Sequence, residues 1–120
     1  MIKFSAMTLY GIPNCDVTKK AMDWLKKNKV AYTFHNYKEE GISVEKLNEW
    51  SKQVGWQSFF NKRSTTWREL PANEQQLVTD QTSAVKIMQQ HNSIIKRPVV
   101  EHKGKLLIGF DEKQYQQALA

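Results

Sequence analysis

The sequence is poor in cysteine: Cys15 is the only one in 120 residues. A single cysteine cannot form a disulfide within the chain, so its thiol is free, transiently bonded to another molecule, or buried and unreactive. The three histidines, His35, His91 and His102, are scattered, without the i, i+4 spacing of a metal-binding helix. With one thiol in total, this pattern speaks against a zinc site, and we expect no metal.

Long apolar runs are lacking as well. No stretch approaches the ~20 apolar residues of a membrane-spanning helix, and the opening segment MIKFSAMTLYG lacks the apolar core of a secretory signal. We therefore expect a cytoplasmic protein with no membrane partner. The sequence also contains neither a glycine-rich phosphate loop nor the nucleophile elbow of serine hydrolases.

The composition is that of an ordinary globular protein, with 40% apolar, 25% charged and 11% aromatic residues. A length of 120 residues predicts one domain. The net charge of +6 is compatible with nucleic acid, an acidic protein or a small anionic substrate. The four tryptophans could stack on bases beside the basic segment NKRSTTWR, but packing in the core explains them better, so nucleic acid is the least favoured partner.

Three segments near the start of the chain predict a β-α-β unit. Residues 7–12 (MTLYGI) and 30–37 (VAYTFHNY) alternate as strands do, and the apolar residues between Asp16 and Asn28 recur at helical spacing, with Val17, Ala21, Trp24 and Leu25 on one face.

The following residues predict helices instead. One helix begins at Ser43 and ends at Gly55, and another follows Thr79 or Thr82 as its cap. Short helical pieces are expected between them, in WQSFFNKRSTTWREL.

The end of the chain predicts a β-β-α unit. Residues 98–101 and 105–110 have the pattern of two strands joined by a tight turn near Gly104, and Asp111 caps a last helix that ends at Leu119. The crossover of the first unit requires a parallel pair, whereas the tight turn requires an antiparallel pair. We therefore predict an α/β fold with a mixed four-stranded sheet in the thioredoxin-like order (β-α-β, then β-β-α). This single domain would have its core at about residues 7–38 and 94–120 and a helical insertion at about residues 39–93.

Cys15 lies in the segment GIPNCDVTKKA, where the first predicted strand gives way to the first helix. At a helix N-terminus the sulfur faces unpaired backbone N–H groups and the positive end of the helix dipole, and both favour the thiolate. A merely structural cysteine is the alternative, which this polar position disfavours. The helix end alone supplies too little free energy to ionise the thiol at neutral pH, so we expect help from a further donor or cation, and Thr18 is the candidate donor. Lys19, Arg63 and Arg97 are the candidate cations.

A second thiol is missing from the place where a dithiol oxidoreductase would carry it, because position 18 is Thr18. A bond formed by Cys15 must then be released by an external thiol, such as that of glutathione or a glutaredoxin. We therefore expect glutathione as a cosubstrate and no bound cofactor.

Three segments, YGIPNCDVTKKAMDWL, KRSTTWREL and KRPVVEHKGKLLIGFDE, resemble the arsenate reductase-like ArsC/Spx family, most closely its YffB-like members. The resemblance covers essentially the whole chain from Met7. It implies a thioredoxin-like fold with a helical subdomain, a reactive cysteine at Cys15, and an Arg-Pro pair at Arg97 and Pro98 with the proline in cis. A cis proline facing the cysteine would expose a backbone edge to a peptide-like thiol such as glutathione.

The resemblance also implies competing functions. Arsenate reductases of the family hold the oxyanion with three arginines. Arg97 matches one of them, Asn61 stands at about the second with Arg63 two residues on, and LLIGF has no basic residue for the third. We expect little arsenate reduction, because two charge-assisted contacts are missing. The Spx branch regulates transcription by binding RNA polymerase, and LLIGFDEKQY is closer to that branch.

The leading hypothesis is a glutathione-linked thiol reductase with Cys15 as its nucleophile. The alternatives are an Spx-like regulator that binds the RNA polymerase alpha subunit and a glutaredoxin-dependent arsenate reductase. The other expected site residues are Thr18 and Lys19 for stabilising the thiolate, and Arg63, Arg97 and Pro98 for binding glutathione or an anion.

Overall fold

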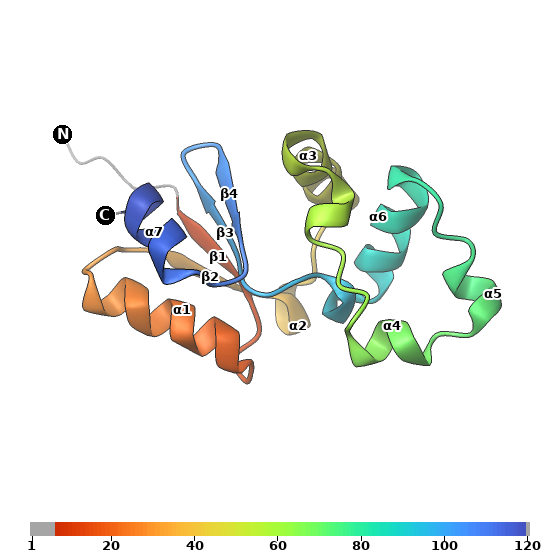
Figure 1. Cartoon of the computed structure of the whole chain (residues 1–120), viewed down its shortest axis with the longest axis horizontal. Helices are drawn as coiled ribbons and strands as arrows, with labels where there is room; N and C mark the ends of the chain where they lie inside the picture. The colour runs from red at the N-terminus through yellow and green to blue at the C-terminus, as the bar shows by residue number, and fades with distance from the viewer. Residues whose placement is uncertain (1–6, 120) are drawn as a thin grey trace. The chain divides into compact units, whose positions relative to one another are not determined.

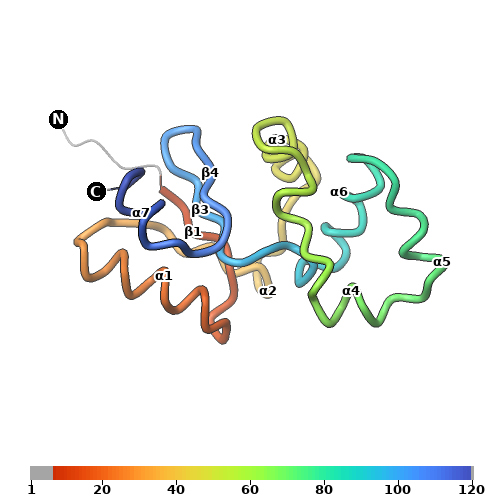
Figure 2. Tube along the Cα trace, in the orientation of Figure 1, coloured from red at the N-terminus to blue at the C-terminus, as the bar shows by residue number. Residues whose placement is uncertain are grey.

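The computed structural model describes residues 7–119, and the chain forms two compact units (Figure 1). The first unit combines the residues up to Glu40 with those from Arg97 onward, and the second spans Gly41–Lys96. Figure 2 traces the chain from the first unit into the second and back. Because the first unit is assembled from both ends of the chain, segments far apart in sequence meet in it.

A four-stranded sheet forms the first unit, in the order β2-β1-β3-β4. β1 (Thr8–Gly11) pairs in parallel with β2 (Thr33–Asn36) and antiparallel with β3 (Val99–His102), and β3 pairs antiparallel with β4 (Lys105–Ile108). α1 (Asp16–Lys27) connects the parallel pair, and α7 (Glu112–Leu119) follows β4. This arrangement confirms the predicted thioredoxin-like α/β fold.

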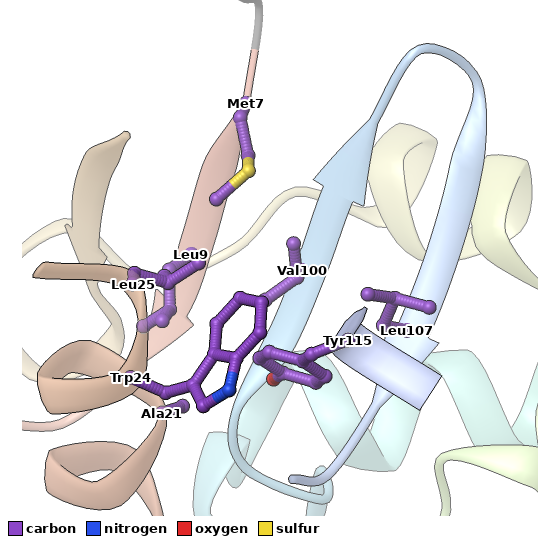
Figure 3. Packing of buried hydrophobic residues seen from close by; sticks show 8 residues of the cluster. All are labelled: Met7, Leu9, Ala21, Trp24, Leu25, Val100, Leu107 and Tyr115. Carbon is purple, nitrogen blue, oxygen red and sulfur yellow. The ribbon is translucent and has the colours of Figure 1, made fainter. Parts of the chain in front are cut away.

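The core of the first unit lies between the sheet and the two helices α1 and α7 (Figure 3). Trp24 of α1 and Tyr115 of α7 meet edge to face, with ring centroids 5.6 Å apart. Burial of these apolar side chains is the main source of stability for the unit. The fully packed residues of this core are Met7, Leu9, Ala21, Trp24, Leu25, Val100, Leu107 and Tyr115.

The buried side of α1 differs from the prediction in its first turn. Val17 is 41% exposed, whereas Thr18 is completely buried together with Ala21 and Leu25. Thr18, Ala21 and Leu25 are spaced i, i+3 and i+7, which is one face of a helix. A polar residue therefore takes the buried position beside Cys15.

The second predicted strand is longer than the observed one. β2 ends at Asn36, and Tyr37 begins a short helix, α2 (Tyr37–Glu40). The side-chain Oδ1 of Asn36 accepts a hydrogen bond from the N–H of Lys38 at 2.9 Å. Such a local side-chain bond competes with strand pairing and favours a turn, which explains why the strand stops there.

Helices make up the second unit: α3 (Val44–Val54), α4 (Thr65–Glu69), α5 (Ala72–Gln75) and α6 (Gln81–Gln90), with 3-10 turns at Trp56–Ser58 and Asn92–Ile94. α3 packs against α6. Trp50 is fully buried and meets Phe59 edge to face, with ring centroids 5.7 Å apart. Trp56 and Trp67 both pack against Phe60, so these tryptophans serve packing, as predicted.

The N-cap of α6 differs from the prediction. The sequence pattern favours Thr79 or Thr82, which is wrong by one or two residues. The cap is Asp80, whose Oδ1 accepts the N–H of Ser83 at 2.9 Å, while the Oγ of Ser83 accepts the N–H of Asp80 at 3.1 Å. This reciprocal pair satisfies two backbone donors at once, which a threonine cap would not do without a partner three residues on. The predicted caps at Ser43 and Asp111 are confirmed.

Tyr115→Phe is expected to lower the free energy of unfolding by about 1 kcal/mol. The buried Tyr115 hydroxyl donates a hydrogen bond to the carbonyl oxygen of Gly109 at 2.7 Å, and phenylalanine removes that bond while keeping the ring. Urea denaturation followed by circular dichroism measures the change. Tyr32→Phe, on a half-buried ring of the same unit, is the matched control, and equal losses in the two variants would contradict the assignment.

Candidate active site around Cys15

Cys15 is the N-cap residue of α1, directly after the turn that leaves β1. Its backbone is extended (φ −103°, ψ 122°), and its carbonyl oxygen accepts the N–H of Lys19 at 2.9 Å. An N-cap side chain lies beside the N–H groups of the first helical turn, which have no partner within the helix. Cys15 is half-buried, so part of this residue is accessible to solvent.

The environment of Cys15 favours the thiolate. Burial raises the pKa of Cys15, but polar groups of the first helical turn and the charge of Arg97 outweigh this effect and leave the pKa below its ordinary value. The hydroxyl and the backbone N–H of Thr18 contribute, followed by the backbone N–H of Val17 and the guanidinium of Arg97. The sequence does not single out the N–H of Val17, although N-cap side chains commonly accept from the N–H two residues on.

Thr18 has an unusual environment for a threonine. Its side chain is 0% exposed, and its Oγ1 has no hydrogen-bond partner among the described residues. A buried hydroxyl is normally hydrogen-bonded, because losing water without a replacement costs free energy. The hydroxyl belongs to the first turn of the helix that Cys15 caps, and it contributes to lowering the pKa of that thiol.

The Arg97-Pro98 pair brings a distant part of the chain to the same site. Its peptide bond is cis, which confirms the geometry implied by the family resemblance. Pro98 is buried, and its carbonyl oxygen accepts the N–H of Gly109 at 2.7 Å. This bond ties the start of β3 to the end of β4, so Arg97 is held by the sheet while its charge acts on Cys15.

For two other predicted site residues, Lys19 and Arg63, no side-chain interaction with Cys15 is described. Lys19 lies on α1 with an exposed side chain, and its backbone N–H donates to the carbonyl oxygen of Cys15. Arg63 is exposed in the second unit, where its backbone N–H donates to Oδ1 of Asn61 at 3.0 Å. The described structure thus brings together Cys15, Thr18 and Arg97, and the roles of Lys19 and Arg63 stay predictions.

Residues 7–119 offer neither a metal centre nor a membrane-spanning helix. Within residues 7–119, no three His, Cys, Asp or Glu side chains gather closely enough to hold a metal ion. The same residues contain no helix whose length and apolar character would let it span a bilayer. The reactive chemistry that these residues do present is that of the Cys15 thiol.

Comparison with known proteins decides the family: residues 10–118 match the ArsC family. The chain belongs to the ArsC family. An uncharacterized protein of Haemophilus influenzae is 41% identical over 114 residues, which cover 95% of this chain and 99% of the relative. The solved structure of the YFFB protein has a TM-score of 0.91 at 43% identity, covering 96% of this ArsC-family chain and 100% of its own. The predicted family is thereby confirmed.

A second group of relatives carries a different description. The global transcriptional regulator Spx 1 of Bacillus cereus is 26% identical over 115 residues, covering 94% of this ArsC-family chain and 86% of the regulator. The proteins similar to this chain therefore include a transcriptional regulator, so similarity alone does not determine its function.

Arg97→Met is expected to raise the pKa of Cys15 and to slow its alkylation at neutral pH by about 1.4- to 5-fold, which is the contribution of an exposed ion pair. Methionine keeps the apolar stem and removes the charge that stabilises the thiolate. The rate of iodoacetamide alkylation as a function of pH measures the effect. Arg68→Met, at an exposed arginine with no proposed role in the site, is the matched control and should leave the profile unchanged. A profile unchanged in Arg97→Met would refute the role of the Arg97 guanidinium.

Proposed function

We propose that this ArsC-family chain is a thiol reductase that uses Cys15 as its nucleophile and glutathione as the resolving thiol. The Cys15 thiolate attacks the glutathione sulfur of a mixed disulfide between a substrate and glutathione. The substrate leaves as a thiolate, and glutathione remains bonded to Cys15. A second glutathione thiolate then attacks the bound glutathione sulfur, which releases oxidised glutathione and restores the Cys15 thiolate.

The observation that carries this proposal is a half-buried thiol at a helix N-terminus, supported by the buried hydroxyl of Thr18. Thiolates are the nucleophiles in disulfide exchange, and a thiol whose pKa approaches the ambient pH attacks most effectively. Because Cys15 is the only cysteine of the sequence, an internal thiol cannot complete the cycle. Glutathione, or a glutaredoxin acting for it, supplies that step in the proposal.

Binding of glutathione is assigned to groups around the sulfur. Arg97, whose charge already acts on Cys15, can pair with a glutathione carboxylate through a charge-assisted hydrogen bond. Pro98 is proposed to border the peptide-like part of glutathione, with Lys19 and Arg63 as further cations. A cytoplasmic location belongs to this proposal, because that compartment keeps thiols reduced through glutathione.

Exposure to oxidised glutathione near neutral pH, followed by intact-mass analysis, tests the proposal. The expected product is one glutathione adduct per chain, which disappears when excess reduced glutathione is added. Protein whose thiol has been alkylated beforehand, and the Cys15→Ser variant, are controls that form no adduct. Failure of the unblocked protein to form an adduct would rule out the mechanism, and faster release with added glutaredoxin would identify that protein as a partner.

The similarity to Spx regulators favours a second function, binding to RNA polymerase. We propose the C-terminal domain of the polymerase alpha subunit as the partner in this alternative. The net charge of +6 predicts that such binding weakens as salt increases. A pull-down in which wild type and Cys15→Ser bind equally would favour the regulator, and absence of binding would eliminate it.

Arsenate reduction is the third candidate. It requires arsenate-dependent oxidation of a glutathione and glutaredoxin mixture, and the expected rate is low, since only Arg97 remains of the three arginines implied by the family. Rapid turnover with arsenate would overturn this expectation and make arsenate the substrate.

A further inference from the structure

Gly11, the last residue of β1, lies in close contact with the side chain of Thr18. A Cβ atom built on Gly11 would be 2.8 Å from Oγ1 and 2.9 Å from Cγ2 of Thr18. Both distances are shorter than nonbonded contacts in proteins allow, so even alanine does not fit without movement. The Thr18 side chain therefore occupies the space that a side chain at position 11 would need.

The backbone conformation does not explain this glycine. Gly41, Gly55, Gly104 and Gly109 have positive φ values, which favour glycine in their turns, whereas Gly11 is part of a strand and has no such value. The three atoms nearest to a Cβ built on Gly11 all belong to the side chain of Thr18. The need for glycine at this position is a need for space, and Thr18 is the residue that uses it.

Thr18 has little freedom to give way. Its side chain is completely buried, its Oγ1 has no hydrogen-bond partner in the described chain, and its hydroxyl contributes to lowering the pKa of Cys15. Moving the side chain away from an added methyl group would change the position of this hydroxyl relative to Cys15. The space left at Gly11 therefore determines where the Thr18 side chain lies relative to Cys15.

We propose that Gly11 is a positioning residue for Cys15: its missing side chain lets the buried Thr18 hydroxyl lie against the sulfur and hold it as a thiolate. The inference deepens the proposed function, because it concerns the same nucleophile. Gly11 touches neither substrate nor sulfur in this role and acts only through Thr18. Arg97 is the charged group that acts on Cys15 among the described residues.

Gly11→Ala tests the proposal through the titration of Cys15. The fraction of thiolate is followed by iodoacetamide alkylation across a series of pH values, with circular dichroism as the check on folding. We expect the titration to move to higher pH and the alkylation rate at neutral pH to fall about tenfold or more, as loss of a hydrogen bond to a charged group predicts. Val44→Ala, a change at an exposed valine of the second unit, should leave the titration in place.

A double-mutant cycle separates this role from a general packing defect. Thr18→Ala removes Oγ1 and Cγ2, the two atoms that an added Cβ would approach too closely, so Gly11→Ala should cause no further change in a Thr18→Ala background. If Gly11→Ala fails to fold, the Gly11→Ala/Thr18→Ala variant should fold, because the collision is gone. A double variant that remains unfolded would overturn the proposal.

The decisive contrary result is a folded Gly11→Ala variant whose Cys15 titrates as in the wild type. A further shift of the same size in the Thr18→Ala background would also overturn the proposal, because Gly11 would then act by another route. Alkylation by iodoacetamide needs no glutathione. The role of Gly11 can therefore stand or fall independently of whether glutathione is the resolving thiol.

Discussion

Leu25→Ala is expected to lower the free energy of unfolding by about 2–5 kcal/mol, a large part of the ~5–15 kcal/mol that stabilises a typical domain. Leu25 is 0% exposed and packs in the core between the sheet and α1, together with Leu9 and Trp24 (Figure 3). Alanine would remove apolar contacts and leave a cavity, since the neighbours belong to different elements and cannot all move inward. Urea denaturation monitored by circular dichroism gives the size of the loss.

The same helix offers a matched control for Leu25→Ala. Val17 also carries an aliphatic side chain but is 41% exposed, so Val17→Ala should change the stability by less than about 0.5 kcal/mol. A loss in Val17→Ala as large as that in Leu25→Ala would mean that α1 presents a different face to the sheet. Unfolding by urea should also return the pKa of Cys15 to its ordinary value, because its donors belong to the folded helix.

The fold could be predicted because its signals are local and mutually consistent. Strand-like alternation before Gly11 and helical spacing through Leu25 mark the first β-α unit, and the tight turn at Gly104 marks the last pair of strands. Because the connection between two parallel strands is almost always right-handed, only a few arrangements of these strands and helices in one sheet are possible. The element ends were predicted less well, since side-chain bonds such as that of Asn36 decide where a strand stops.

The site could be predicted only in part. A cysteine just before a helix is visible in the sequence, and so is a threonine three residues later. That Thr18 rather than Val17 is buried depends on the rotation of α1 against the sheet, which the apolar pattern leaves open between adjacent residues. Arg97 is far from Cys15 in sequence, so its place beside the thiol followed from the family resemblance and became visible in the folded sheet. The fit between Gly11 and Thr18 has no sequence signal at all, because it is a matter of interatomic distances.

Thr18→Cys is expected to abolish the accumulation of the glutathione adduct on Cys15. In the wild type the only thiol able to release the adduct comes from another molecule, whereas this variant places a second thiol one helical turn from the nucleophile. That thiol, as thiolate, attacks the Cys15 sulfur of the mixed disulfide, expels glutathione as its thiolate, and leaves a disulfide within the chain. The intramolecular step benefits from a high effective concentration and outruns attack by free glutathione.

Intact-mass analysis distinguishes the two products of Thr18→Cys. The expected species after treatment with oxidised glutathione has no adduct, lacks two hydrogens and contains no free thiol, whereas the wild type carries glutathione. Thr18→Ser is the matched control: it keeps a hydroxyl near the sulfur and supplies no thiol, so its adduct should persist. If Thr18→Cys accumulated the adduct as the wild type does, the side chain at position 18 would not reach the sulfur. Both its role as donor and the positioning role of Gly11 would then fail together, because each requires contact between residue 18 and Cys15.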